Sequence, residues 1–132
     1  MASFAIPNLQ RAVFEADTAT VRKIIRTAAE AVEIYASENG DYPTNITSLT
    51  NVAPPYLSDE YHDYCLTLAD DSSGYIHQGF VLGCTFENFA RKYKITAFVP
   101  DGGKGSTKHT SIAPSMHMAF EDGMAYTESN IP

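Results

Sequence analysis

The feature that most constrains this chain is an uninterrupted stretch, residues 8–39, that contains neither proline nor glycine. In its second half, apolar residues recur at steps of three and four, which is typical of one face of an α-helix: Val21, Ile24, Ile25, Ala28, Val32 and Tyr35. Pro7 suits the first turn of that helix, where its missing N–H costs nothing. Asn39 and Gly40 supply the left-handed residue that commonly ends a helix. The pattern predicts a single rod roughly 45 Å long.

The first half of this helix, from Leu9 to Thr20, consists mostly of alanine and polar residues. Its only large apolar residues are Leu9, Val13 and Phe14. A helix face with so little to bury contributes little to a core. We therefore expect this half to project beyond the folded domain.

After the helix, the apolar period changes to that of strands. Pro54 and Pro55 exclude a helix at that point and indicate an extended connection, which follows a short helical turn expected at 45–51. The expected strands are rich in β-branched and aromatic residues, and the last two form a hairpin: Tyr64–Leu68, Tyr75–Phe86, Tyr93–Val99, Ser115–Phe120 and Met124–Thr127. The predicted architecture is α+β in a single domain, with a long helix (1–40), a connection (41–63) and an antiparallel sheet region (64–132).

Charge is divided unevenly along the chain. Residues 27–90 contain no Lys or Arg and ten acids, so this segment carries -10, while the rest carries nine basic and six acidic residues, or +3. Such a division lets copies of the chain attract one another, although an acidic face can also simply be solvated. The basic residues within 91–108, which have the aromatic residues Phe89 and Tyr93 near them in the chain, are a candidate contact surface for a neighbouring copy or for DNA: Arg91, Lys92, Lys94, Lys104 and Lys108.

Motifs for catalysis and for metal binding are missing from the sequence. No G-x-S-x-G nucleophile motif occurs, and the loop around Lys104 fails the phosphate-loop pattern because Phe98 stands where its first glycine belongs. His62 and Cys65 have a spacing that a zinc site uses, but no second pair accompanies them. We expect surface or capping roles for the histidines, and we predict no catalytic residue, no cofactor and no metal.

Two segments of the long helix are similar to known sequences. Residues 5–12 (AIPNLQRA) resemble the segment that follows the membrane stretch in type IV pilins and type II secretion pseudopilins. Residues 31–44 (AVEIYASENGDYPT) resemble the helix end of that family, with an aromatic residue followed by NG and YP. Weaker similarity extends to the sheet, at Tyr93–Phe98 and at Glu121–Gly123. The chain departs from the family in lacking the leader and the apolar half of the helix, which we expect to have been cut away, with Met1 as an added start.

The resemblance implies a structural filament subunit rather than an enzyme. Its partners would be other copies of itself, other pilin subunits and the machinery that assembles a pilus or a type II secretion pseudopilus. It would be anchored in the inner membrane of a bacterium before it joins an extracellular surface filament. The residues expected to pack between subunits lie on the helix: Leu9, Val13, Val21, Ile24, Ile25, Ala28 and Val32.

Three further expectations depend on the same resemblance. The two cysteines, Cys65 and Cys84, are compatible with a disulfide or with two separate thiols, and export of pilins favours the disulfide. Some major pseudopilins bind calcium in C-terminal loops. Asp101 and Asp122 are only minor candidates for such a site, because no dense acidic loop is present. The alternative function is that of a minor pilin acting as a binding module for DNA uptake or adhesion.

Overall fold

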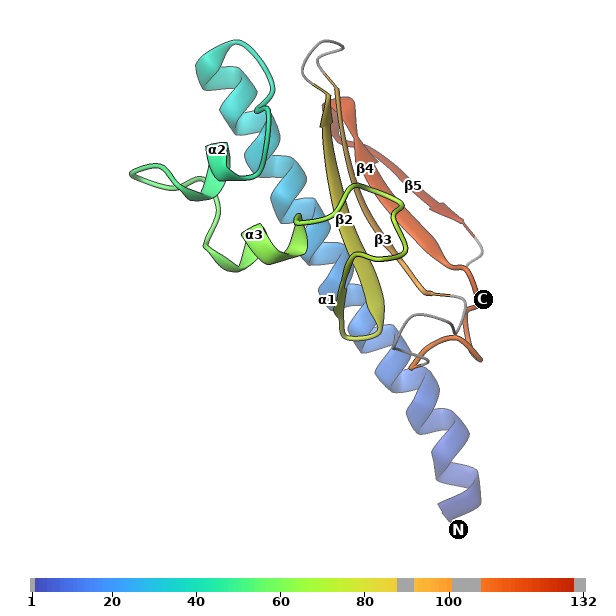
Figure 1. Ribbon diagram of the computed structural model, residues 1–132. Helices are drawn as coiled ribbons and strands as arrows, with labels where there is room; N and C mark the ends of the chain where they lie inside the picture. Colours follow the sequence, from blue (N-terminus) through green and yellow to red (C-terminus); the bar gives the residue numbers. More distant parts are fainter. Residues whose placement is uncertain (1, 88–91, 101–107, 130–132) are drawn as a thin grey trace.

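The structure is a computed structural model that describes residues 2–87, 92–100 and 108–129, with side chains from residue 9 onward. One long helix packs against one face of a five-stranded antiparallel sheet, and two short helices lie beside it (Figure 1). The elements in chain order are α1 (Ala2–Asn39), α2 (Thr47–Thr50), α3 (Glu60–Tyr64), β1 (Tyr75–His77), β2 (Phe80–Glu87), β3 (Lys92–Phe98), β4 (His117–Glu121), the 3-10 turn η1 (Asp122–Met124) and β5 (Ala125–Ser129). The predicted α+β arrangement of a long N-terminal helix on an antiparallel sheet is confirmed.

Helix α1 begins earlier than the sequence predicts and ends where it predicts. It begins at Ala2, so Pro7 lies inside the helix rather than in its first turn. A proline there removes one backbone hydrogen bond to the preceding turn, which the rest of the helix tolerates. At the other end, Gly40 has a φ of 80° and its N–H donates to the carbonyl of Ala36 at 2.8 Å. This left-handed glycine is the expected C-terminal cap.

The sheet is a simple meander in which strands β1 to β5 are neighbours in chain order. The single strand predicted over Tyr75–Phe86 is two strands, because Gln78 and Gly79 both have positive φ values, 50° and 86°, and turn the chain between β1 and β2. The predicted strand Tyr93–Val99 corresponds to β3, and the predicted C-terminal hairpin is formed by β4 and β5.

The core lies between α1 and one face of the sheet. Val21, Ile25 and Val32 are buried on the helix, opposite strand residues that alternate toward it, such as Leu82, Ile95, Ala97, Met118 and Phe120. The opposite face of the sheet, called the outer face below, carries the intervening residues. The helix therefore uses its apolar stripe inside its own domain.

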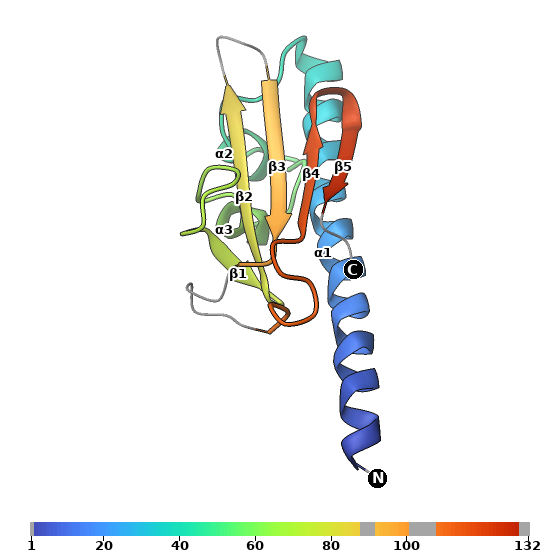
Figure 2. The ribbon, with the colours of Figure 1, turned by 90° about the vertical axis from the view of Figure 1, so that its right-hand side faces the viewer.

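The projecting part of α1 is shorter than predicted. Phe14, Asp17 and Thr18 are buried, and the hydroxyl of Thr18 donates to the carbonyl of Phe14 at 2.7 Å. The expectation that the whole segment up to Thr20 stands free was wrong, because the loop that ends at β4 reaches down to this level of the helix. The turns before Val13 do extend beyond the sheet (Figure 2).

The strand predicted at Tyr64–Leu68 is absent. Tyr64 ends helix α3 instead, and the following residues lead to β1 without joining the sheet as a strand. Tyr61 and Tyr64 are partly buried against the core from helix α3 rather than by strand pairing. The sheet region therefore begins at Tyr75 rather than at residue 64.

Candidate assembly surface

The structure divides the helix residues predicted to pack between subunits into two groups. Val21, Ile25, Ala28 and Val32 are fully buried in the core of their own domain. Their prediction as contacts with other subunits was wrong, because a side chain enclosed by its own sheet offers no surface to a partner. The same 3.6-residue period marks a helix buried by its own sheet and one buried by a neighbour.

The other residues of that set remain accessible to a partner. Leu9 is 61% exposed, while Val13 and Ile24 are half-buried. Leu9, Ala12 and Ala16 are all exposed and recur at steps of three and four, so they share one face of the projecting turns. Small residues on a helix face allow the close approach of another helix. This face is an uncovered apolar surface at the N-terminal end of α1.

A second exposed surface, which the sequence did not predict, lies at the opposite end of α1. Ile34 is 53% exposed and lines an open groove of about 540 Å³ together with Val52. Tyr35 and Tyr56 form its aromatic wall, with ring centroids 5.5 Å apart and nearly perpendicular planes. Ile34 lies outside the buried apolar stripe of α1. An apolar residue outside that stripe was the signal from which this surface could have been predicted.

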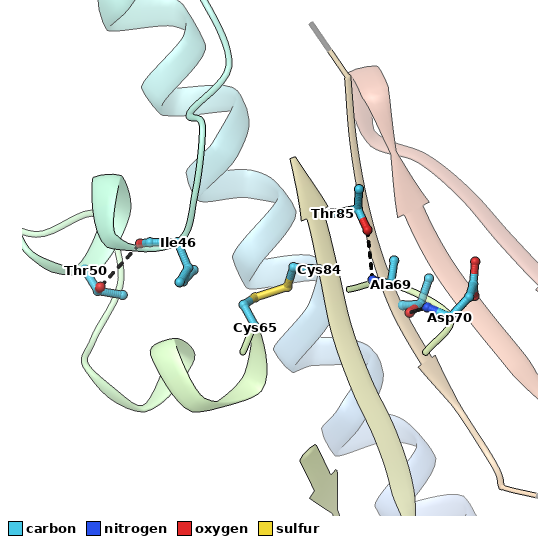
Figure 3. The surroundings of a disulfide bond; sticks show 8 residues. Ile46, Thr50, Cys65, Ala69, Asp70, Cys84 and Thr85 are labelled. Carbon is cyan, nitrogen blue, oxygen red and sulfur yellow. Dashed lines mark hydrogen bonds between the residues drawn. A yellow bond between two sulfur atoms is a disulfide. The ribbon is translucent and has the colours of Figure 1, made fainter. Parts of the chain in front are cut away.

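Cys65 and Cys84 are joined by a disulfide (Figure 3), with Cα atoms 4.8 Å apart. The disulfide connects the end of α3 to the middle of β2, and both residues are buried. The carbonyl of Thr67 accepts from the N–H of Cys84 at 2.9 Å, so the chain runs beside β2 directly after the cross-link. The disulfide thereby fixes the starting point of the segment that leads to β1.

That segment crosses the outer face of the sheet. The N–H of Ala69 donates to Thr85 Oγ1 at 2.9 Å, as Figure 3 shows, and the N–H of Asp70 donates to Thr96 Oγ1 at 3.0 Å. Gly83 permits the crossing, because a Cβ at that position would lie 2.5 Å from the carbonyl oxygen of Leu68. The middle of the outer face is therefore covered by residues 68–70.

The carboxylate of Asp70 is held by two basic side chains of the sheet. Its Oδ2 lies 2.6 Å from Lys94 Nζ on β3, and its Oδ1 contacts His117 Nε2 on β4. Burial alone would raise the pKa of Asp70, but the hydrogen bonds and charges of Lys94 and His117 outweigh it and lower the pKa below its ordinary value. The crossing segment is thus fastened electrostatically as well as covalently.

The predicted basic surface is not a single patch among the residues that the structure describes. Lys94 is paired with Asp70, and Lys108 is paired with Asp17 of α1, 2.8 Å from Nζ to Oδ2. Lys92 is exposed opposite Glu87 in the β2–β3 ladder. Arg91 and Lys104, together with Phe89 and Asp101, lie outside the described residues. Lys94 on the outer face and Lys108 beside α1 belong to different sides of the sheet.

A carboxylate on α1 joins the helix to one end of the sheet and to the loop that follows α1. Glu33 Oε2 accepts from the hydroxyl of Tyr93 at 2.7 Å, from the hydroxyl of Tyr42 at 3.1 Å and from the N–H of Gly123 at 3.0 Å. Burial and the hydrogen bond to this carboxylate raise the pKa of Tyr93 far above its ordinary value. In sequence Glu33 is one charged residue among several on the helix, and nothing in its spacing marks it.

His109, expected at the surface or as a cap, is only 1% exposed. Its Nε2 lies 2.9 Å from Asp17 Oδ2 and 3.1 Å from the carbonyl of Gln78, and its ring meets Phe14 edge-on at 5.2 Å. Within the described part of the chain its Nδ1 has no hydrogen-bond partner. This side chain fastens the loop before β4 to α1 and to the β1–β2 turn.

Among the residues that the structure describes there is neither a metal site nor a membrane-spanning helix. Across residues 2–87, 92–100 and 108–129, no three His, Cys, Asp or Glu side chains are arranged to hold a metal ion. Asp122, a minor candidate for calcium, accepts from the N–H of Tyr93 at 2.7 Å. Over the same ranges, none of the helices has the length and hydropathy of a membrane span. Comparisons with protein-family models, with curated proteins and with solved structures found no significant match.

Proposed function

We propose that this chain is a structural subunit of a filament of the type IV pilus or type II secretion pseudopilus kind. The proposal starts from the resemblance of residues 5–12 and 31–44 to that family. The arrangement of one long helix, a short connecting region and an antiparallel meander suits such a subunit. The chain acts through assembly with copies of itself and with related subunits, and it performs no catalysis.

One observation supports this proposal more than any other. The projecting turns of α1 carry the exposed apolar face of Leu9, Ala12 and Ala16, which the domain itself does not cover. An exposed helix of a few turns is marginal in water by itself, since most helical stability in proteins comes from packing. A neighbouring helix would supply that packing, and a subunit that repeats the contact in one direction builds an open filament.

No specific observation favours the alternative of a DNA-binding minor pilin. DNA binding draws its affinity from basic side chains that neutralise phosphates. Lys94 and Lys108 are already neutralised by Asp70 and Asp17. The assembly proposal is therefore the one we carry forward.

The test uses the full-length protein in cells that produce it. An antibody to the domain should decorate surface filaments in electron micrographs, and Leu9→Glu should abolish the decoration, because it places a charge on the helix face that neighbours would cover. Leu68→Glu is the matched control, since Leu68 is 63% exposed and Leu9 is 61% exposed, but Leu68 lies on the crossing segment. The proposal fails if the wild-type protein labels no filament, or if Leu9→Glu is incorporated as well as the control.

A further inference from the structure

Four aromatic rings meet where α3 approaches the edge strand β1. Tyr64 lies at their centre, with ring centroids 5.2 Å from Tyr61, 5.6 Å from Tyr75 and 5.2 Å from His77. Tyr75 and His77 stand side by side on β1 with nearly parallel rings, 6.4 Å apart. These four residues are called the Tyr64 cluster below. Tyr61 and Tyr64 pack against the core, whereas Tyr75 and His77 extend the cluster beyond it.

The Tyr64 cluster is supported from behind and open in front. Tyr61 and Tyr64 line one small cavity together with Ile24 of α1, and the disulfide directly follows Tyr64 in the chain. Tyr75 is 41% exposed, while the other three rings are half-buried. Rings that are held by one another and by a helix lose little conformational entropy when a ligand covers them. The cluster is thus a preformed aromatic surface of the kind that binds partners.

Acidic side chains of α3 lie beside the Tyr64 cluster. Glu60 and Asp63 lie exposed on α3, next to Tyr61 and Tyr64 in the chain, and Asp59 precedes them. No Lys or Arg occurs anywhere in residues 27–90, which include all of α3 and β1. Phosphate-rich ligands are repelled by such a surface. Cations are attracted to it, both by the carboxylates and by the negative faces of the rings.

We propose that the Tyr64 cluster is a docking site for an arginine-bearing segment of a partner protein. A guanidinium group is planar and weakly hydrated, so it stacks on a tyrosine face while it donates hydrogen bonds to a carboxylate. The exposed ring of Tyr75 supplies the stacking surface, and Glu60 and Asp63 supply the acceptors. Lysine offers a strongly hydrated point charge and stacks less well. The site is separate from the apolar face of α1 and does not depend on the filament proposal.

The direct test is an NMR titration of the whole ¹⁵N-labelled chain with a (Gly-Arg)4 peptide. Amide shifts should be concentrated at residues 60–64 and 75–77 and should saturate. A (Gly-Lys)4 peptide should bind the same residues more weakly, and a (Gly-Glu)4 peptide should leave them unshifted. Shifts that spread over every acidic residue, or that the glutamate peptide reproduces, overturn the proposal.

Variants separate the aromatic contribution from the charge. Tyr75→Leu should weaken (Gly-Arg)4 binding by about two- to fivefold, the range expected for one exposed cation–π contact. Tyr75→Phe keeps the ring and should bind like the wild type, which guards against an effect of misfolding. Tyr126→Leu is the matched control, because Tyr126 is 36% exposed on β5 at the opposite edge of the sheet. Equal weakening by Tyr75→Leu and Tyr126→Leu contradicts the proposal.

The carboxylates are tested in the same assay. The double variant Glu60→Gln with Asp63→Asn preserves shape and should weaken (Gly-Arg)4 binding by about two- to thirtyfold at low salt, the range of two exposed ion pairs. The effect should shrink as salt is added. Glu15→Gln with Glu121→Gln removes the same charge elsewhere and should change binding little. If both double variants act alike, binding reflects net charge alone and the proposed site is wrong.

Discussion

Replacing Glu33 by alanine should destabilise the domain far more than replacing any other glutamate of α1. Glu33 accepts three hydrogen bonds, from Tyr93, Tyr42 and the backbone of Gly123. Hydrogen bonds to a charged acceptor contribute roughly 1.5–3 kcal/mol each when buried, and less where water reaches them. Tyr93 is buried, so its hydroxyl would lose its acceptor in a place that water reaches poorly. We expect a loss of about 3 kcal/mol, since the three bonds share one oxygen.

Glu30→Ala is the matched control for this substitution. Glu30 lies three residues earlier on the same helix and pairs only at the surface with Arg26, at 3.3 Å. Such an exposed pair contributes about 0.3–0.5 kcal/mol, and the change in helix propensity is the same in both variants. Urea unfolding followed by circular dichroism should place Glu33→Ala about 2–3 kcal/mol below Glu30→Ala, with an unchanged dependence on urea concentration.

A second readout connects the loss to the hydroxyl groups. Burial raises the pKa of Tyr93 and the hydrogen bond to Glu33 raises it further, so removing Glu33 should lower this pKa part of the way toward its ordinary value. Absorbance at about 295 nm should then show a tyrosine that ionises at a lower pH than in the wild type. Equal unfolding free energies for Glu33→Ala and Glu30→Ala would refute the reasoning, as would an unchanged alkaline titration.

Three further predictions follow from the fold. The native protein should have an intact mass two hydrogens below that of the reduced chain and should resist thiol labelling, whereas full labelling of native protein would contradict this. Reduction of the Cys65–Cys84 bond should lower the unfolding free energy by roughly 3 kcal/mol. Amide exchange should be fast at 9–12 and slow at 21–32, and equal protection of both segments in the monomer would show that the projecting turns are covered. The pKa of Asp70 is lowered in the folded state, so its carboxylate stabilises the fold above its ordinary pKa of 3.8 and loses that effect as pH falls through the lower folded value. The wild type should therefore lose more unfolding free energy between about pH 6 and pH 2 than Asp70→Asn does.

The sequence predicted the fold to the extent that local signals determine it. The long helix, its glycine cap, strand β3 and the β4–β5 hairpin were all marked by period and turn chemistry. The split of Tyr75–Phe86 into two strands was not, because Gln78 carries a positive φ that only Gly79 beside it suggests. The predicted strand at 64–68 failed for a tertiary reason, since Tyr64 ends helix α3 and is partly buried against the core there. Alternation of apolar residues does not identify the surface that buries them.

The contacts that fasten the domain were harder to predict, because each joins residues far apart in the chain. Asp17 and His109 are separated by 92 positions and Glu33 and Gly123 by 90. Neither pair belongs to a sequence motif, and polar residues such as Asp17 and Glu33 are common on protein surfaces. The cysteine pair was the exception: its count left a disulfide or two separate thiols open, and the resemblance to exported pilins favoured the disulfide that the structure shows.

The charge division illustrates the same limit and changes the interpretation of the acidic segment. Sequence counting suggested that the acidic middle of one copy faces the basic cluster of another. The structure instead joins Lys94 to Asp70 within one domain, and Lys108 to an acid of α1. Part of the attraction between acidic and basic residues therefore acts within one domain, where it holds the crossing segment against the sheet. The acids of α3 keep their exposure, as do Glu38 and Glu87, so negative charge remains for a partner at several places, one of them beside the Tyr64 cluster.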